Sequence, residues 1–374
     1  MAVYKIFPTK DTTLYSAYPS MNTGLDEILE ASTNFIEGPL KLVGDTPQTS
    51  RTLIQFNSDD ISYVSQSLIK NKDWKVYLKL FVANTTGIQT DTKILVNALS
   101  QSWDMGTGFY SSYPEVQNGA SWTWSDYSGS TSWKTSNFAN NSTASFEVLN
   151  PGGGVWWVTP SASQTFSYRS NLDLNFDVTG IVQYWTGSVW NNNGFILRQD
   201  PSQEFINNIN KQTTLKYFSI DTHTIYPPQL EFRWNDFVWN TGSSTQTVIN
   251  DSDVYISLAN NPGFFYPESI QRFRLNVRPQ YPTRTFQTSS IYTTNYYLPS
   301  GSSYYAVKDL HTNEMVIDFD EKYTLISSDE ESSFFDIYMN GLEPERYYCI
   351  LIQTTIGDTT LILDNNYNFK IING

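Results

Sequence analysis

Residues able to carry out acid–base, nucleophilic or metal chemistry are sparse in this sequence, and none stands in a recognisable catalytic motif. The histidines His223 and His311 have no neighbouring cysteines, so no zinc site is expected. No G-x-S-x-G motif occurs, and the glycine run 152–154 lacks the Lys-Ser/Thr of a phosphate-binding loop. Paired carboxylates, as in glycoside hydrolases, remain an alternative, because only the folded chain sets their separation. We therefore predict no catalytic residue, no cofactor and no enzymatic activity.

Acidic residues cluster at three places, and such clusters can bind calcium when their carboxylates are spaced as ligands. None of the three clusters has the spaced ligand pattern that specifies a calcium loop. We interpret them as solvated turns and predict no metal site. The clusters are Asp26, Glu27 and Glu30; Asp59 and Asp60; and Asp329, Glu330 and Glu331.

The segment 101–170 combines Ser, Gly and Asn with tryptophans and is predicted to form long loops. Loops of this length inside a compact domain are usually functional or stabilised by a partner. Flat aromatic rings stack on sugar rings, which points to a glycan site. The alternative is that the rings pack against the protein itself or against a neighbouring subunit. The candidate residues for glycan or partner binding are Trp103, Trp122, Trp124, Tyr127, Trp133, Trp156 and Trp157.

Arginines gather around a proline-rich turn in the last third of an otherwise acidic chain. Guanidinium groups pair well with carboxylates, so these residues could dock onto an acidic subunit. The alternative is a solvated strand face, and the sequence leaves both open. The candidate interface residues are Arg272, Arg274, Arg278 and Arg284.

The composition favours strands over helices. The 374 residues include 25 Tyr, 22 Phe and 11 Trp, while charged residues make up only 16%. Aromatic side chains fit the half-buried surface of a sheet and lose rotamers in a helix. The net charge of −14 repels phosphate groups, so neither nucleic acid nor an anionic membrane is an expected partner. The first residues lack the apolar core of a secretory signal, so export by the general route is not expected.

Period-two alternation recurs along the chain and predicts strands with one wet face. It is clear at 74–82, 172–178 and 230–234. Helical spacing occurs only at 61–68 and 178–185. Antiparallel sheets that bury one face each must stack, which predicts an all-β protein with an N-terminal jelly-roll or β-sandwich and a second, immunoglobulin-like β-sandwich. The predicted domains are 1–234 and 235–374.

A short signature in the second domain supports the immunoglobulin-like prediction. In GLEPERYYCILI, Leu342, Pro344 and Tyr348 are spaced as in the corner before a late core strand of such sandwiches. In that corner the tyrosine hydroxyl returns to the upstream backbone. The single cysteine, Cys349, excludes an intrachain disulfide and is predicted to be buried in this strand.

Residues 11–234 resemble the DNRLRE family, a jelly-roll module similar to carbohydrate-binding modules. The resemblance rests on DTTLYSAYPSMNTGLDEILEAS, RTLIQF, VYLKLFV, SWDMGTGFY with SWTW, FDVTGIVQYWTGSVWNNNGFILR and PQLEFRW. The C-terminal third resembles the closing domain of virion structural proteins of marine tailed phages with contractile tails (myoviruses), in RFRLNVRPQYPTRTFQTSSIYTTNYYLP, SYYAVKDLHTNEMVIDFD and GLEPERYYCILI.

These resemblances imply a structural component of a tailed-phage virion in the tail, neck or baseplate. The expected partners are other virion proteins and further copies of the chain in a symmetric particle. Such a protein folds in the host cytoplasm and ends in the virion. The alternative is a carbohydrate-binding or receptor-binding particle protein that uses the loops of the first domain to bind a host-surface glycan.

Overall fold

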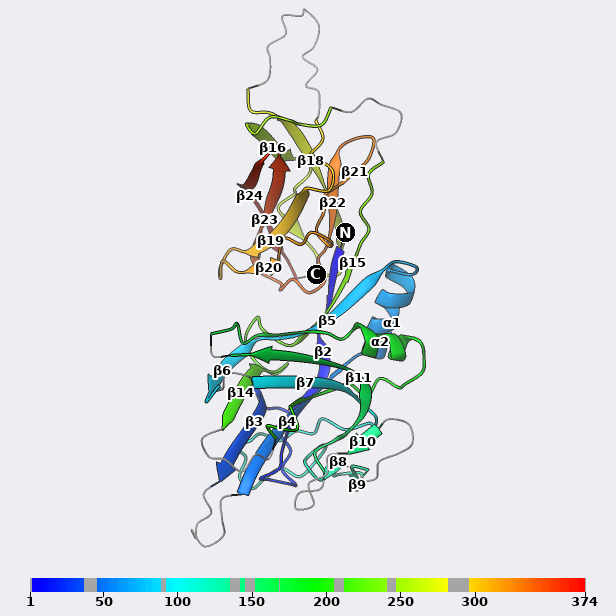
Figure 1. The fold of residues 1–374 in the computed structure, drawn as a ribbon, viewed down its shortest axis with the longest axis vertical. Helices are drawn as coiled ribbons and strands as arrows, with labels where there is room; N and C mark the ends of the chain where they lie inside the picture. The colour runs from blue at the N-terminus through cyan, green and yellow to red at the C-terminus, as the bar shows by residue number, and fades with distance from the viewer. Residues whose placement is uncertain are drawn as a thin grey trace, which may run out of the picture. The chain divides into compact units, whose positions relative to one another are not determined.

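The computed structural model confirms the all-β prediction: strands dominate, and the only helical segments described are short (Figure 1). The structure describes residues 2–36, 46–88, 92–134, 142–144, 152–167, 169–204, 212–240, 247–281 and 296–373. Contacts divide the chain into two units. The larger unit comprises 6–70 and 75–231, and the smaller unit comprises 1–5, 71–74 and 232–374.

The predicted domains, 1–234 and 235–374, differ from these contact units at 1–5, 71–74 and 232–234, which belong to the smaller unit. Val3 belongs to the hydrophobic core of the smaller unit, although it precedes the larger unit in the sequence. The chain passes between the units within β1 (Ala2–Ile6), β5 (Trp74–Leu80) and β15 (Gln229–Trp234). The division into domains 1–234 and 235–374 stays a prediction.

The larger unit contains a long antiparallel sheet of order β10-β11-β7-β13-β4-β3-β14-β6, in which β2 also pairs with β4 (Figure 1). Its residues alternate between the core and solvent where the sheet has one wet face, as in β14, with Leu215 and Tyr217 buried. The strands are β2 (Pro8–Tyr15), β3 (Ile28–Ile36), β4 (Thr46–Phe56), β6 (Val82–Thr86), β7 (Thr92–Leu99), β10 (Ser142–Ala144), β11 (Val155–Phe166), β13 (Phe195–Gln199) and β14 (Thr213–Phe218).

A second antiparallel pairing in the larger unit joins β5 to β12 (Leu174–Asp177). Leu78 and Leu80 of β5 are buried, and so are Leu174 and Phe176 of β12. The period-two prediction is therefore confirmed for these strands, because alternate side chains enter the core.

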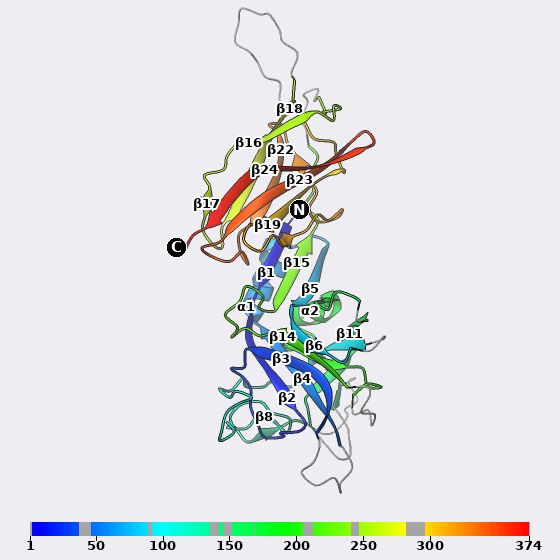
Figure 2. The ribbon, with the colours of Figure 1, turned by 90° about the vertical axis from the view of Figure 1, so that its left-hand side faces the viewer.

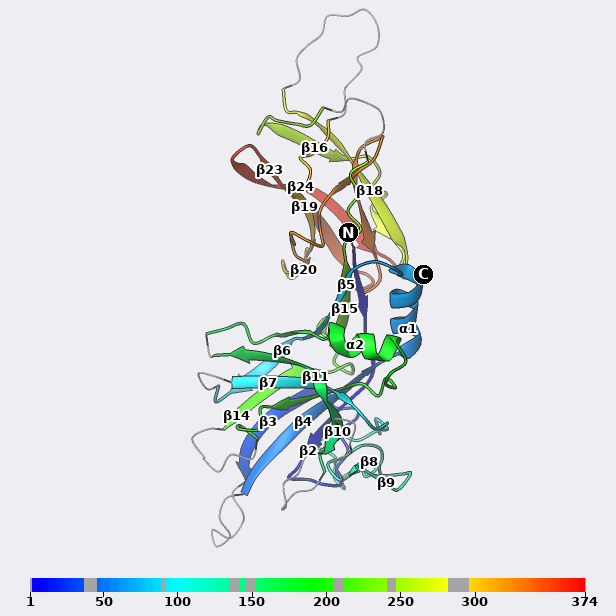
Figure 3. The same ribbon diagram turned by 45° about the vertical axis from the view of Figure 1, so that its right-hand side comes forward.

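The two predicted helical segments are confirmed, and both are short. The first is α1 (Ser58–Ser62), which continues as the π-helical turn η1 (Tyr63–Leu68), and the second is α2 (Thr179–Thr186). Figure 3 shows α1 and α2 side by side in the larger unit.

The predicted loop segment 101–170 is wrong in its last part, because β11 is a twelve-residue strand. The second half of β11 is largely exposed and lies near the end of the sheet, so its sequence alternates only weakly between apolar and polar residues. A strand made mostly of serine, threonine and other polar residues gives little period-two signal. Residues 101–134 are mainly loop, with the short hairpin β8 (Trp124–Asp126) and β9 (Thr131–Ser132).

The smaller unit is a β-sandwich of two sheets, ordered β16-β18-β22-β21 and β17-β24-β23-β19-β20 (Figures 1 and 2). Phe273 and Phe335 of the first sheet and Tyr305 and Phe369 of the second share one buried core, with Phe335 stacked between the rings of Phe273 and Tyr305. The strands are β16 (Val254–Leu258), β17 (Phe264–Phe265), β18 (Ile270–Pro279), β19 (Ser303–Asp309), β20 (Met315–Ile317), β21 (Ser327–Ser328), β22 (Ser333–Tyr338), β23 (Tyr347–Ile356) and β24 (Thr359–Ile371).

The tyrosine corner of the smaller unit is confirmed. The backbone N–H of Glu343 donates to the Tyr348 hydroxyl at 2.7 Å, and that hydroxyl lies 3.3 Å from the Glu343 carbonyl oxygen. Cys349 follows in β23 and is buried, as predicted.

Candidate functional site

Four of the candidate aromatic residues lie in the core of the larger unit. Trp103, Trp122, Trp133 and Trp156 are each at most 5% exposed and belong to one hydrophobic cluster. The indole N–H of Trp133 donates to the Ser121 carbonyl oxygen at 2.9 Å. For these four tryptophans the structure has the alternative arrangement, in which the rings pack against the protein itself. A ligand does not reach rings that are buried in this way.

The loop that carries these tryptophans is anchored by a buried asparagine, Asn22. Its amide nitrogen donates to the carbonyl oxygens of Met105 and Ala120, both at 2.8 Å. Its amide oxygen accepts from the backbone N–H groups of Gly24 and Gly108. A Cβ at Gly108 would lie 2.1 Å from the Asn22 carbonyl oxygen, so this close approach requires glycine. One side chain therefore positions loop 101–123 against the loop that follows β2.

The remaining candidates, Trp124, Tyr127 and Trp157, are half-buried and present part of each ring to solvent. Trp124 and Tyr127 meet edge to face in the β8–β9 hairpin, with centroids 5.4 Å apart. Trp157, on β11, stacks on Trp190 at 4.7 Å with parallel planes, and Trp190 also contacts Tyr184 of α2 at 4.4 Å.

A pocket of about 190 Å³ lies beside this stack, between α1 and the C-terminal end of α2. Trp190 forms part of its wall, and the polar residues of the wall carry no charge. They are Ser58, Ser62, Thr186, Ser188, Asn191 and Asn192. An aromatic wall with neutral hydroxyl and amide groups suits a neutral polar ligand. We use the name tryptophan pocket for this pocket together with Trp157 and Tyr184, the two rings that pack on its wall residue Trp190.

A second exposed aromatic group was missed in the sequence because its members are tyrosines and a phenylalanine in two separate loops. Tyr18, Phe109 and Tyr110 are exposed, and Tyr113 in the same loop is 99% exposed. Tyr110 packs on Tyr18 and on the buried Tyr15, with centroid distances of 5.9 and 4.9 Å. The run GFYSSY was the only local signal. We name these four exposed residues the tyrosine surface.

Charged groups lie next to the tyrosine surface. Burial raises the pKa of Asp26, and the nearby charge of Glu30 acts in the same direction. Lys216 pairs with Glu30 at 2.7 Å. Burial and the neighbouring Tyr18 raise the pKa of Tyr110 to about 12. The tyrosine surface therefore borders on a predominantly acidic region.

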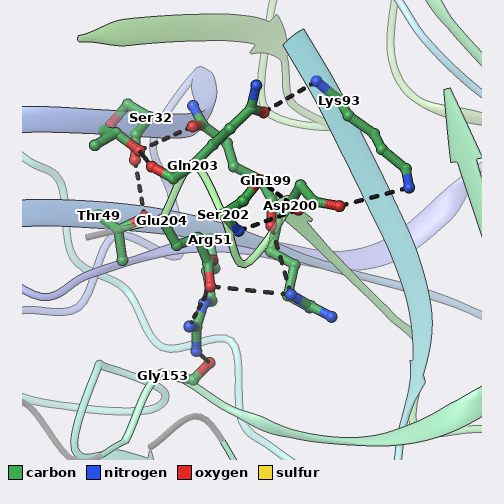
Figure 4. A network of polar contacts seen from close by, with 12 residues as sticks. Ser32, Thr49, Arg51, Lys93, Gly153, Gln199, Asp200, Ser202, Gln203 and Glu204 are labelled. Carbon is green, nitrogen blue, oxygen red and sulfur yellow. Dashed lines mark hydrogen bonds and ion pairs between the residues drawn. The ribbon is translucent and has the colours of Figure 1, made fainter. Parts of the chain in front are cut away.

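Figure 4 shows a buried polar network around Arg51 and Glu204 that sequence reasoning missed. Arg51 of β4 donates from Nε and Nη2 to the two carboxylate oxygens of Glu204, each at 2.8 Å, and from Nη1 to the Gly153 carbonyl oxygen. Its guanidinium lies 4.8 Å from the Trp122 ring centroid and 5.2 Å from that of Trp156. These contacts of Arg51 join residues of the larger unit to one another, so the network positions the core rings.

Two of the candidate interface arginines form ion pairs within the smaller unit. Arg272 makes a two-point pair with Asp336 at 2.8 and 2.9 Å. Arg274 makes the same kind of pair with Asp329 at 2.9 and 2.8 Å.

The other two arginines are placed differently. Arg278 lies over the Tyr255 ring at 4.4 Å and donates to the carbonyl oxygens of Pro279 and Gln280. Arg284 lies outside the described residues. An interface through these arginines stays a prediction.

An exposed row of side chains crosses the outer face of the smaller unit's second sheet. Lys370 of β24 pairs in register with Phe264 of β17 on one side and with Tyr347 of β23 on the other. Phe264 and Tyr347 are both more than half exposed, and Lys370 lies 5.7 Å from the Tyr347 ring centroid. Lys370 also pairs with Glu345. We name Phe264, Lys370 and Tyr347 the aromatic row.

Metal-ligating side chains do not gather into a three-ligand centre in the part of the chain that the structure describes. No group of three His, Cys, Asp or Glu residues that could hold a metal ion is found there. His311 lines an open pocket with Leu310, Arg346 and Tyr347. No described helix is long and apolar enough to cross a membrane.

Comparison with known proteins places the chain in no family. No family model matches it, and no curated protein matches it. A DUF4785 family protein from Legionella pneumophila is 7% identical, with 98% of this chain and 65% of that chain covered at a TM-score of 0.17. A β-glucuronidase from Parabacteroides merdae is 9% identical, with 98% and 36% covered at a TM-score of 0.16. The chain thus spans less than two thirds of either protein, and similarities this low carry no argument about its function.

Proposed function

We propose that this chain is a structural component of a tailed-phage virion, in the tail, neck or baseplate, that acts through contacts with other virion proteins and with further copies of itself. The aromatic row carries the proposal. Phe264 and Tyr347 present large apolar surfaces on a sheet face, where burial by a partner is favourable. Aromatic side chains of this kind are enriched at protein interfaces.

The sequence resemblances support the same proposal. The strands β18, β19 and β23 contain parts of the segments that resemble the closing domain of marine myovirus virion proteins. The segments that resemble DNRLRE jelly rolls lie in the larger unit, except for the last three residues of PQLEFRW, which belong to the smaller unit. A β-sandwich offers a rigid face and several loops to neighbours at once, which suits an assembly protein.

Mass spectrometry of purified particles tests the proposal. The chain is expected at a stoichiometric level in particles that survive gradient purification and a high-salt wash. Its absence from such particles would remove the structural assignment.

A variant series tests the aromatic row itself. Phe264→Ser and Tyr347→Ser are expected to reduce incorporation into particles while the variants stay folded, because both side chains are exposed. Ile362→Ser is the matched control, since Ile362 is exposed on the same β24 strand but pairs with Gln353, away from the row. Equal incorporation of all three variants and the wild type would exclude the aromatic row as the contact surface.

A second candidate function is binding of a neutral host-surface glycan, and the tryptophan pocket favours it. The stacked Trp157 and Trp190 provide flat apolar surface, and the uncharged Ser and Asn side chains of the wall provide hydroxyl and amide partners.

A glycan-array screen of the variants Tyr184→Ala and Trp157→Ala tests glycan binding at the tryptophan pocket. The control variant is Trp124→Ala, which changes the other half-buried aromatic pair. Binding that both pocket variants lose and the control keeps would make recognition the primary function.

A further inference from the structure

A buried carboxylate in the larger unit lacks half of its hydrogen bonds. Asp11 of β2 is 1% exposed. Its Oδ2 accepts from the backbone N–H of Ile220 at 2.7 Å, while Oδ1 is buried without a hydrogen-bond partner among the described residues. An unpaired carboxylate oxygen in the interior is costly, and such groups are normally paired or bound to a cation.

A second unpaired carboxylate oxygen comes from the loop that follows β14. Asp221 stands next to Ile220, whose N–H contacts Asp11, and its Oδ2 is also buried without a partner among the described residues. The loop is held in place by Ser219, whose N–H donates to the Glu27 carbonyl oxygen at 3.0 Å and whose hydroxyl donates to that of Asp26. Three separate segments therefore meet around the two carboxylates.

The charges that act on these two carboxylates are negative. Burial raises the pKa of Asp11 to about 8, and the charge of Asp221 acts in the same direction. Burial likewise raises the pKa of Asp221, and the charge of Glu27 adds to it. The charge of Asp221 acts on Asp11, and one oxygen of each acid is buried without a partner among the described residues, an arrangement that a cation stabilises.

We propose that Asp11 and Asp221 bind a calcium ion that joins β2 to the loop after β14. Calcium accepts six to eight oxygen ligands in irregular geometry, whereas magnesium requires a near-ideal octahedron and zinc prefers nitrogen and sulfur. No group of three acidic, histidine or cysteine side chains suited to a metal is found in the described ranges, so an ion at Asp11 and Asp221 would take its other ligands from backbone carbonyl oxygens and water. The negative charge of Glu27 also acts on Asp221.

The ion has a structural role, because it joins elements that are distant in the sequence. Asp11 and Ile220 are 209 positions apart and bracket most of the larger unit. Binding to the folded state alone stabilises it in proportion to the logarithm of the calcium concentration. The inference is independent of the proposed virion function and of either aromatic surface.

Thermal unfolding of the full chain, stripped of metal, tests the site. Calcium at 100-fold above its Kd is expected to raise the Tm of the larger unit by about 5–10 °C relative to chelator. Magnesium at the same concentration is expected to give a clearly smaller shift. Titration calorimetry is expected to give one bound calcium ion per chain.

Variants localise the effect. Asp11→Asn and Asp221→Asn are expected to lose the calcium-induced shift in Tm, while Asp59→Asn, an exposed acid of α1, keeps it. If Asp11→Asn does not fold, Asp221→Asn serves alone, since Asp221 is only half-buried. A wild-type Tm that calcium leaves unchanged, a shift that survives in Asp221→Asn, or an equal effect of magnesium would each overturn the proposal of a calcium site at Asp11 and Asp221.

Discussion

Arg51 and Glu204 form a two-point ion pair inside the larger unit, although 153 positions separate them in the sequence. Their side chains are 1% and 6% exposed. The aromatic rings of Trp122 and Trp156 lie within about 5 Å of the same guanidinium, which adds cation–π contacts. The pair therefore links strand β4 and the loop after β13 to the tryptophan core.

Removing one member of this pair is expected to destabilise the larger unit strongly. Glu204→Ala leaves a buried guanidinium without its counter-charge, which costs about 3–5 kcal/mol. Denaturant unfolding followed by tryptophan fluorescence measures the loss. The control is Lys75→Ala in the exposed pair with Asp177, for which a loss of about 0.2–1 kcal/mol is expected. Similar losses for both variants would contradict the structural role of the pair.

The tyrosine corner predicts a contrast between adjacent residues. Tyr348→Phe removes the hydroxyl that accepts from the Glu343 N–H and is expected to cost about 1–3 kcal/mol in the smaller unit. Tyr347→Phe, at the exposed neighbouring position, is expected to change stability by less than about 0.5 kcal/mol. Urea unfolding monitored by circular dichroism separates the two. If Tyr348→Phe is as stable as the wild type, the corner contributes nothing to the fold.

The pair of Arg274 and Asp329 predicts an acid-dependent loss of stability. Burial opposes ionisation of Asp329, but the hydrogen bonds from Arg274 and from the backbone outweigh it and lower its pKa to about 2. A lowered pKa means that the folded state favours the charged form, so the stabilisation is present above about pH 4 and lost as the pH falls towards 2. After solvent screening this stabilisation is about 1 kcal/mol.

Asp329→Asn is therefore expected to lower the Tm at pH 6 and to leave it unchanged near pH 2. Asp358→Asn, which changes an exposed acid in the turn between β23 and β24, is the control. Its Tm at pH 6 and its Tm near pH 2 should both match those of the wild type. The measurement is thermal unfolding across this pH range. A variant effect that is constant with pH would show that the ion pair is not its cause.

The loop anchor Asn22 predicts a local effect. Asn22→Ala leaves two carbonyl oxygens and two backbone N–H groups without their partner, which is expected to cost at least about 2 kcal/mol. Limited proteolysis is expected to cleave within 101–123 much faster than in the wild type. Asn118→Ala, which loses contacts with Thr107 in the same loop, is the matched control. Unchanged cleavage in Asn22→Ala would mean that the loop is held by other contacts.

The sequence alone determined the features that depend on local periodicity. Alternation of large apolar residues predicted β5, β12 and β15, helical spacing predicted α1 with η1 and α2, and the spacing in GLEPERYYCILI predicted the corner at Tyr348. These predictions succeed because the periodicity of a strand or helix alone decides which side chains share a face, independently of contacts with the rest of the chain. The virion function and the family resemblances stay predictions.

Only the tertiary structure decided which functional candidates are accessible. Trp122 and Trp157 look alike in the sequence, yet Trp122 is enclosed in the core, whereas Trp157 is half-buried and stacks on Trp190, which lines a pocket. The partners of Arg51 and Asp11, and the meeting of Tyr18 with Tyr110, join segments far apart along the chain. Such pairings depend on how the sheets stack and where the loops are anchored. Neither can be predicted from the spacing of residues along a single strand.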